Sequence, residues 1–432
     1  MNNINFSDLS ISDKLLDILT SQKFTKPTEI QAKTIPQAIK GNDIIGISQT
    51  GTGKTLAFMI PIIEKMINSK KQALIIVPTR ELAAQVEESS KPITNRLNIK
   101  TVNLIGGESF ERQLFALKRN PQIVIGTPGR ILDHLKRKTF KPNLVNFLVL
   151  DEADMMLDMG FIPQVEDILK QIKGEKQTML FSATMPKAII SIASQFMKLP
   201  VSVEVAPSGT VAEKVEQEIF IINHENKFHH LHKTIDSHKG SILVFVRTKQ
   251  GASTLCEKLL DLNFKVVEIH SNLSLARRKK SLLDFKTGRA QIMVATDVAA
   301  RGLDVKDIEL VVNYQLPDNK EDYVHRIGRT ARADKSGKAI TFVANNQKRE
   351  VLMIESLIRQ EIKKTDFSKD FNRSMPRANE TKREEKKEAP RQKKQSNKPR
   401  RPFRSDKPKN NFGPKNSSKH KRVPKKFGNR NR

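Results

Sequence analysis

The stretch FLVLDEAD (residues 147–154) joins a fully apolar run to the carboxylates of Asp151, Glu152 and Asp154. A short apolar run of this kind is typical of a strand buried inside a parallel sheet, and it would carry Asp151 and Glu152 to the end of that strand. A solvated turn is the plain alternative for these acidic residues. Burial argues against it, because an unpaired carboxylate is costly at a buried sheet end.

A glycine-rich loop lies upstream, between an apolar run at 44–47 and a helix-like segment at 56–66. It consists of Ser48, Gln49, Thr50, Gly51, Thr52, Gly53, Lys54 and Thr55. Glycines let backbone N–H groups close around phosphate oxygens, and a helix N-terminus adds positive potential there. In such loops the lysine contacts the β- and γ-phosphates and the hydroxyl after it binds magnesium.

The loop and the carboxylates together predict a site that hydrolyses ATP or GTP with magnesium. We expect Thr55 and Asp151 to hold the metal, Lys54 to contact the phosphates, and Glu152 to orient and deprotonate the attacking water. The usual loop pattern has glycine where this chain has Ser48. The loop alone is also compatible with a glycine-rich turn of no function, and the carboxylate pair makes that alternative remote.

Short β-branched runs alternate with helix-length segments along two stretches, which predicts two parallel α/β domains. The runs in the first stretch are 44–47, 73–77, 123–125, 147–150 and 178–181, and those in the second are 219–222, 242–246, 266–269, 292–294, 310–312 and 339–343. We expect a final helix at about 346–364 and an interdomain connection within 199–216. The predicted organisation is a first domain at 1–205, a linker at 206–216, a second domain at 217–365 and a basic tail at 366–432.

The formal charge of +30 is uneven, since residues 371–432 carry an excess of +18. Such an excess indicates a polyanionic partner, and nucleic acid is favoured over membrane because no stretch reaches the ~18 apolar residues that span a bilayer. A solubilising extension is the alternative for the tail, which is too polar to fold and is expected to be disordered. The N-terminus has no apolar signal segment, and Cys256 is the only cysteine, so we expect a cytoplasmic protein without disulfides.

With these residues in view, the chain resembles the DEAD-box RNA helicases from Phe6 to about residue 343, with the family's motifs in order. The motifs are the FTKPTEIQ segment at 24–31, the loop at 48–55, PTRELA at 78–83, the glycine pair at 106–107, TPGR at 127–130, DEAD at 151–154, SAT at 182–184, ATD at 295–297 through RGLD at 301–304, and HRIGRTAR at 325–332. Leu275 stands where the family commonly has glutamine, three residues before Arg278, His270-Ser271 replaces a common His-Gly, and Ser48 replaces a common alanine.

The resemblance implies two tandem RecA-like domains with ATP and RNA as ligands, and it implies roles for residues that the chemistry alone leaves unassigned. Adenine recognition falls to Phe6, Phe24 and Gln31, and further nucleotide contacts fall to Gly302 and Asp304. RNA contacts fall to Arg80, Gly107, Thr127, Arg130, Arg278 and Thr296. Coupling of hydrolysis to strand separation falls to Ser182, Thr184, Asp154 and His325, and the arginine fingers are Arg329 and Arg332.

The sequence therefore predicts an ATP-dependent RNA helicase that opens short duplexes locally or remodels RNA–protein complexes when its two domains close. Two rivals remain open. An ATP-gated RNA clamp would use identical motifs, and a DNA translocase of the wider superfamily is disfavoured by Gln31 and the complete DEAD tetrapeptide. Ribosomal or RNA-decay proteins are possible partners by family analogy only.

Overall fold

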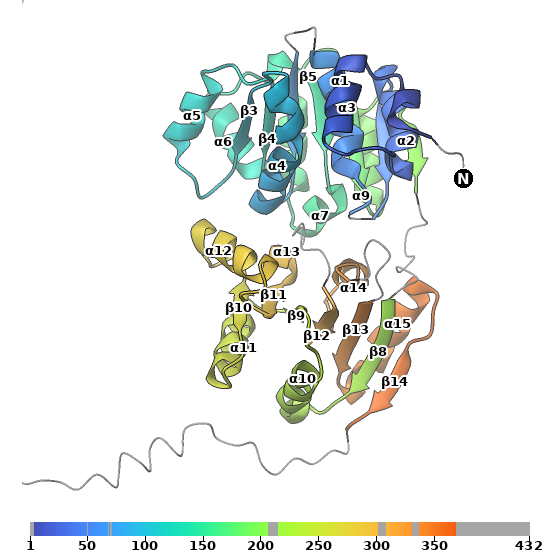
Figure 1. Cartoon of the computed structure of the whole chain (residues 1–432), viewed down its shortest axis with the longest axis vertical. Coiled ribbons are helices and arrows are strands. Elements are labelled where there is room, and N and C mark those ends of the chain that lie inside the picture. Colours follow the sequence, from blue (N-terminus) through green and yellow to red (C-terminus); the bar gives the residue numbers. More distant parts are fainter. Residues whose placement is uncertain are drawn as a thin grey trace, which may run out of the picture. The chain divides into compact units, whose positions relative to one another are not determined.

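The computed structural model describes residues 4–49, 51–67, 69, 71–205, 215–300, 308–330 and 337–368, which form two sheet-and-helix regions (Figure 1). Each region is described by itself. The basic tail from residue 369 onward lies outside the described residues.

The first region contains a seven-stranded sheet in the order β3-β4-β2-β5-β6-β1-β7, in which every paired strand is parallel. Its strands are β1 (Ile44–Ile47), β2 (Gln72–Ile76), β3 (Thr101–Leu104), β4 (Ile123–Gly126), β5 (Val145–Leu150), β6 (Gln177–Ser182) and β7 (Val201–Glu204). Parallel neighbours need crossover connections, so helices cover both faces of this sheet. The helices are α1 (Asp13–Ser21), α2 (Glu29–Ile39), α3 (Lys54–Met66), α4 (Arg80–Arg96), α5 (Phe110–Leu117), α6 (Pro128–Lys136), α7 (Ala153–Asp158), α8 (Ile162–Gln171) and α9 (Lys187–Phe196), with short 3₁₀ turns at Phe6–Leu9 and Pro142–Leu144.

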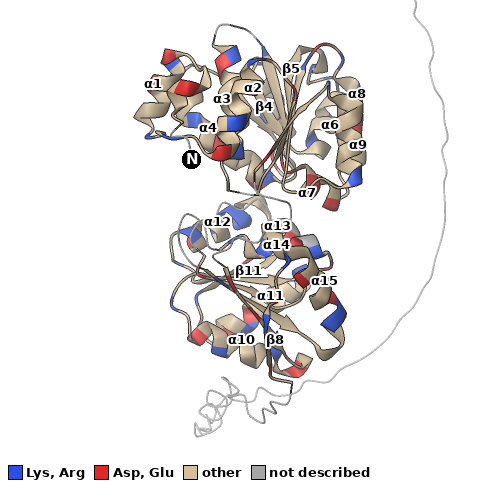
Figure 2. Cartoon of the chain, turned by 90° about the vertical axis from the view of Figure 1, so that its right-hand side faces the viewer, with Lys and Arg blue, Asp and Glu red and all other residues tan. Residues whose placement is uncertain are grey.

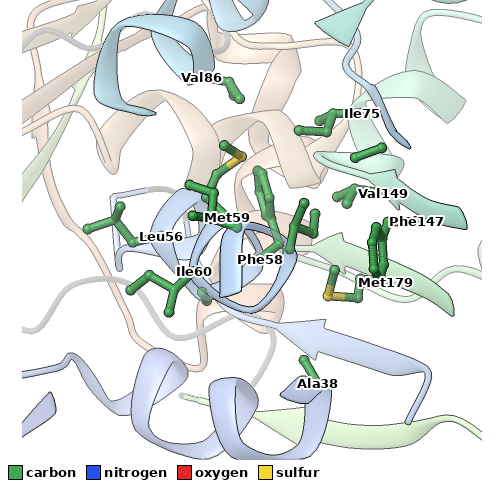
Figure 3. Close-up of a cluster of buried hydrophobic side chains, with 14 of the residues drawn as sticks. Ala38, Leu56, Phe58, Met59, Ile60, Ile75, Val86, Phe147, Val149 and Met179 are labelled. Atoms are coloured by element: carbon green, nitrogen blue, oxygen red, sulfur yellow. The ribbon is translucent and has the colours of Figure 1, made fainter. Parts of the chain in front are cut away.

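Two hydrophobic cores lie on opposite faces of the first sheet, and β2 shows why its sequence is apolar throughout. Ala73 and Ile75 enter one core, whereas Leu74 and Ile76 enter the other. Successive side chains of a strand point to opposite faces, so a strand buried on both sides has no polar positions. Figure 3 shows Phe58 of α3 packed among the strand residues of the first core.

The second region repeats this plan with a seven-stranded parallel sheet in the order β10-β11-β9-β12-β13-β8-β14. Its strands are β8 (Val215–Ile221), β9 (Ile242–Val246), β10 (Val266–Ile269), β11 (Ile292–Thr296), β12 (Leu310–Asn313), β13 (Gly337–Val343) and β14 (Lys363–Asp366). Its helices are α10 (Lys227–Asp236), α11 (Lys249–Asp261), α12 (Leu275–Lys286), α13 (Asp297–Ala300), α14 (Lys320–Ile327) and α15 (Lys348–Ile358), with 3₁₀ turns at His224–Asn226 and Asn345–Gln347. In both regions charged residues lie mainly on helices and loops (Figure 2), and among the strands of the second sheet β8 and β14 carry charged residues.

The predicted α/β class with two parallel sheets is confirmed, but three elements differ from expectation. The edge strand β3 was not predicted, and β7 lies inside the stretch that we expected to be connection. The expected final helix is wrong beyond Ile358, because Arg359 adopts a left-handed conformation (φ 55°) that ends α15. The chain then forms β14, which pairs with β8.

Two further features concern membranes and the single cysteine. Among the described helices, none is long and apolar enough to cross a bilayer. Cys256 is buried on α11, and burial raises the pKa of its thiol to about 12, so it packs as a small apolar residue.

Candidate functional site

The glycine-rich loop connects β1 to α3 at the carboxyl end of the first sheet, and its glycines are required by geometry. Gly51 (φ 90°) and Gly53 (φ 96°) adopt left-handed conformations that side chains disfavour. A Cβ atom on Gly53 would also lie 2.5 Å from Nε2 of Gln31. The loop therefore lies so close to Gln31 that only a glycine fits at position 53.

Lys54 begins α3 and is buried between the loop and the acidic strand end. Its Nζ donates to the Ser48 carbonyl at 3.2 Å and lies 3.5 Å from Oε1 of Glu152. Burial lowers the pKa of Lys54, but the carboxylates of Glu152, Asp151 and Asp154 outweigh burial and raise it above its ordinary value. Lys54 is thus a fixed positive charge at the place where phosphates are expected.

Ser48, which departs from the usual loop patterns, is bonded within the loop. Its hydroxyl lies 3.0 Å from Oγ1 of Thr52, and Thr52 donates to the Gln49 carbonyl at 2.9 Å. Thr55 follows Lys54 and is half-buried in the first turn of α3. Thr55 occupies the position of the phosphate-loop motif whose hydroxyl binds the metal ion.

The carboxylates of Asp151 and Glu152 end β5 as predicted, and both are buried. The Asp151 N–H donates to the Ile76 carbonyl at 3.0 Å, and Oδ1 of Asp151 is buried without a hydrogen-bond partner. Burial raises the pKa of Asp151 to about 7, with Glu152 adding to the effect and Lys54 opposing it. A buried carboxylate oxygen without a donor fits a hard cation such as magnesium, which prefers oxygen ligands.

Glu152 differs from Asp151 in its backbone conformation and in the direction of its pKa shift. Its φ is 55°, an uncommon conformation for a residue other than glycine, and one that often marks functional sites. Burial is the strongest single influence and raises the pKa of Glu152, but Lys54 and the other positive charges near it together outweigh burial and lower the pKa below its ordinary value. Glu152 is therefore ionised at neutral pH and suited to accept a proton.

The third carboxylate of the tetrapeptide, Asp154, joins the DEAD and SAT segments. Oδ2 of Asp154 accepts from the N–H groups of Ala183 and Thr184 at 3.0 and 2.9 Å and from the Thr184 hydroxyl at 3.2 Å. The Ser182 hydroxyl accepts from the Asp154 N–H at 3.1 Å. The structure thus brings together three of the four residues that we expected to couple hydrolysis to strand separation.

Gln31 is buried beside the loop, and its side-chain amide makes two of the four hydrogen bonds that it can form. Its Oε1 accepts from the Thr28 N–H at 2.9 Å and its Nε2 donates to the Gly53 carbonyl at 3.0 Å. A glutamine amide offers two donors and two acceptor sites, so one donor and one acceptor site remain for a nucleobase. Phe6 is 2% exposed and packs in the first core, whereas Phe24 is 36% exposed.

The residues of the first region that are expected to grip RNA lie at the carboxyl ends of β2, β3 and β4. The Arg80 guanidinium packs against Gly106 and Gly107, and Gly107 has a φ of 79°. Arg130 donates to the Glu108 carbonyl at 3.1 Å, and the Thr127 N–H donates to the Leu104 carbonyl at 3.0 Å.

A buried glutamine that sequence reasoning missed organises this edge. Oε1 of Gln113 accepts from Arg130 at 3.1 Å and lies 3.3 Å from Nε2 of His134, and its Nε2 donates to the Ile105 carbonyl at 2.8 Å. No sequence signal marks it, because its partners come from other segments.

In the second region the residues around Thr296 surround a buried arginine that we did not predict. Arg326 is 1% exposed and bonds both carboxylate oxygens of Asp297, at 2.5 and 2.7 Å. It also donates to Oδ1 of Asn313 at 3.2 Å and to the Gln315 carbonyl at 2.7 Å. This network fixes the strand end that carries Thr296.

The remaining expected residues of the second half are placed as follows. Arg329 is 3% exposed, and Nδ1 of His325 lies 3.9 Å from Asp322. Arg278 is also buried and donates to Oε2 of Glu81 at 2.8 Å. Four expected site residues lie outside the described residues: Thr50, Gly302, Asp304 and Arg332.

Comparisons with known proteins agree with this geometry. A family model described as DEAD/DEAH box helicase matches residues 28–192, and one described as helicase conserved C-terminal domain matches residues 226–334. The chain is 43% identical over 363 residues to the DEAD-box ATP-dependent RNA helicase CshA of Bacillus subtilis (strain 168), an alignment that covers 83% of this chain and 73% of CshA.

Solved structures show the same similarity. Dbp5 of S. cerevisiae bound to RNA and ADP BeF3 has a TM-score of 0.76 at 31% identity, covering 84% of this chain and 95% of that one. The DEAD-box helicase Mss116 bound to ssRNA and UDP-BeF has a TM-score of 0.77 at 28% identity, covering 84% of this chain and 80% of that one.

Proposed function

Because this chain belongs to the DEAD-box family of ATP-dependent RNA helicases, we propose that it opens short RNA duplexes locally or remodels RNA–protein complexes. Its two parallel sheets are tandem RecA-like domains, and it is an RNA helicase that hydrolyses ATP and binds RNA. The proposal concerns how its residues couple these activities. In it, the two domains close over ATP and a single strand of RNA, which displaces the partner strand.

The buried, unpartnered Oδ1 of Asp151 is the single observation that carries the proposed hydrolytic site. Thr55 and Asp151 would hold Mg²⁺, which supplies positive charge for the phosphates and returns Asp151 to its ionised form. Lys54 fixes the β- and γ-phosphates. Glu152, kept ionised beside Lys54, takes the proton of the attacking water.

Closure provides the charge that is missing from the first domain. Arg329 and Arg332 act as fingers that neutralise the transition state only when the second domain approaches ATP. Gly302 and Asp304 hold the nucleotide from the same side. Hydrolysis then depends on any ligand that stabilises closure, and RNA is that ligand.

Adenine recognition rests on Gln31, whose remaining donor and acceptor match the N7 and N6 groups of the base. Phe24 and Phe6 complete this side of the site, together with the loop residues Ser48, Gln49, Thr50, Gly51, Thr52 and Gly53. The bond from Gln31 to Gly53 links the base-reading residue directly to the phosphate loop.

RNA is held through its backbone and without sequence preference by Arg80, Gly107, Thr127, Arg130, Arg278 and Thr296. Asp154, Ser182 and Thr184 connect this grip to hydrolysis, because their hydrogen bonds join the catalytic strand end to the segment after β6. His325 completes the coupling from the second domain.

The expected bounds are 1–205 for the first domain, 206–216 for the linker and 217–365 for the second domain, whose strands run from Val215 to Asp366. Beyond the core, the basic tail at 366–432 holds RNA electrostatically. The +18 excess of residues 371–432 supports this role. If five to ten tail cations engage RNA, truncation after residue 370 flattens the salt dependence of binding by about 3–7 units of slope. A cytoplasmic location, with ribosomal or RNA-decay proteins as partners, belongs to the same proposal.

A strand-displacement assay tests the proposal. The full chain is mixed with ATP, Mg²⁺ and a short labelled duplex, made once of RNA and once of DNA, and both ATP turnover and released strand are measured. We expect RNA to stimulate turnover and its labelled strand to be released. Stimulated turnover without release would show an RNA clamp, and equal stimulation by DNA would show a translocase.

A further inference from the structure

Helix α5 and the C-terminal end of α6 share a basic surface with an exposed aromatic ring, next to the loops that grip RNA. We propose that this surface binds the RNA that flanks the gripped segment, with Phe115 stacking on a base. The inference rests on the proposed RNA grip and extends it. The α5–α6 face is defined by Arg112, Phe115, Lys118, Arg119, Lys136, Arg137 and Lys138, and Figure 1 shows α5 and α6 near β3 and β4.

Phe115 is the most unusual residue of the face, because its ring is 60% exposed although a large apolar side chain gains from burial. The Arg119 guanidinium lies 4.7 Å from the centre of that ring. An exposed aromatic ring paired with an arginine is the combination on which single-stranded nucleic acids stack, since every base has a π-face.

The charge of the face matches a phosphate backbone. Its six Lys and Arg residues are exposed, and the exposed carboxylates beside or among them are those of Glu108, Glu111 and Asp133. An acidic protein would also suit such charge. RNA is favoured because the face is continuous with Gly107, three residues before α5, and with Arg130 on α6.

Buried contacts make α5 and α6 a single rigid platform with that grip. Gln113 of α5, 4% exposed, accepts from Arg130 and contacts His134 of α6, which is fully buried. The rings of His134 and Phe110 stack at 4.2 Å, and the Arg137 guanidinium lies 4.4 Å from the Phe110 ring. RNA held by Arg130 is therefore delivered to a surface whose position relative to Arg130 is fixed.

The test compares RNA lengths in a matched pair of variants. One carries Phe115→Ala and Arg119→Ala, and the control carries Arg349→Ala and Leu352→Ala on α15, where Arg349 and Leu352 are also exposed. Both keep the full chain, including the tail. Affinity is measured with a non-hydrolysable ATP analogue for a short RNA of about six nucleotides and for the same RNA extended by about six at each end.

We expect extension to tighten binding by the wild type and the control, and the Phe115→Ala, Arg119→Ala variant to lose about tenfold of that gain. Its affinity for the short RNA, and its turnover at saturating short RNA, should stay those of the wild type. An equal length gain in this variant would overturn the inference while leaving the grip intact. Failure of the wild type to bind either RNA would overturn the proposed function itself.

Discussion

Buried charges occur at the carboxyl ends of both sheets, but they are satisfied to different degrees. In the second sheet Arg326 has a partner for its charge, two bonds to Asp297 and further acceptors on Asn313 and Gln315. In the first sheet Asp151 keeps an oxygen without a donor, although it is equally buried. A complete network holds structure, whereas an incomplete one is poised for a ligand that supplies the missing charge.

The largest effect should follow from removing the proton acceptor of the incomplete site. Glu152→Gln keeps the shape but not the base, so ATP turnover should fall by roughly 10²–10⁴-fold. ATP and RNA should still bind, and nucleotide binding to the variant is measured alongside turnover. Glu216→Gln, a change of an exposed carboxylate in the second sheet, is the control and should leave turnover unchanged. Normal turnover in Glu152→Gln would mean that another group activates the water.

Breaking the complete hydrogen-bond network around Arg326 should lower the free energy of unfolding of the second region. Arg326→Met removes the buried partner of Asp297, whose side chain is 20% exposed, and this loss costs about 3–5 kcal/mol. The chain has no tryptophan, and its tyrosines are Tyr314 and Tyr323, so tyrosine fluorescence during urea unfolding reports on the second region alone. Adding Asp297→Asn should recover part of the loss. A cost below about 1 kcal/mol would show that Arg326 contributes little to the stability of the fold, and the contrast between the two sheets would then disappear.

The sequence predicted the central strands and the positions of the phosphate loop and the DEAD tetrapeptide at strand ends, because each has a local signature. Strands buried on both faces are apolar throughout, and the phosphate loop needs glycines at fixed positions. The edge strands β3 and β7 are short and partly exposed, so neither has a full apolar run. β14 was missed because its sequence, KKTD, is polar and because Arg359 ends α15 without the usual glycine.

The polar residues that complete the sites were harder to predict. Gln113 and Arg326 act through partners that are remote in sequence or belong to other elements. A glutamine on an amphipathic helix, or an arginine in a basic motif, is ordinarily exposed. Their burial is a property of the packed fold and has no periodic signal.

A smaller effect, of opposite sign, should follow from neutralising Asp151. Burial raises the pKa of Asp151 to about 7, so its neutral form stabilises the fold below about pH 4 and that stabilisation is lost as the pH rises through 7. Asp151→Asn has no such loss. Without metal or nucleotide, it should be more stable than the wild type by about 1–3 kcal/mol at pH 8 and equally stable at pH 4.

Urea unfolding followed by circular dichroism, with a chelator present, measures this difference, and the tyrosine signal of the second region serves as the internal control. The same substitution should also lower ATP turnover, an effect on activity that ranks with that of Glu152→Gln. Equal stability of the two proteins at pH 8 would show that the ionised Asp151 does not destabilise the metal-free protein. The buried charges of the two sheet ends would then be equally well satisfied.

The smallest effect concerns Gln31, which is intermediate between the complete and incomplete networks because half of its amide is already bonded. Gln31→Ala removes its bond to Gly53 and also its contact with adenine, and the adenine contact is worth about 0.5–1.5 kcal/mol in binding. The KM for ATP should therefore rise about three- to tenfold, and the use of GTP should stay poor and unchanged.

Thr28→Ala, which keeps the Gln31 amide and the Thr28 backbone donor, is the matched control and should preserve the preference for ATP. Steady-state turnover with ATP and GTP at saturating RNA measures both effects. If the wild type hydrolyses GTP as readily as ATP, the free half of the Gln31 amide does not read the base, and its bonds to Thr28 and Gly53 make it a structural group like Arg326.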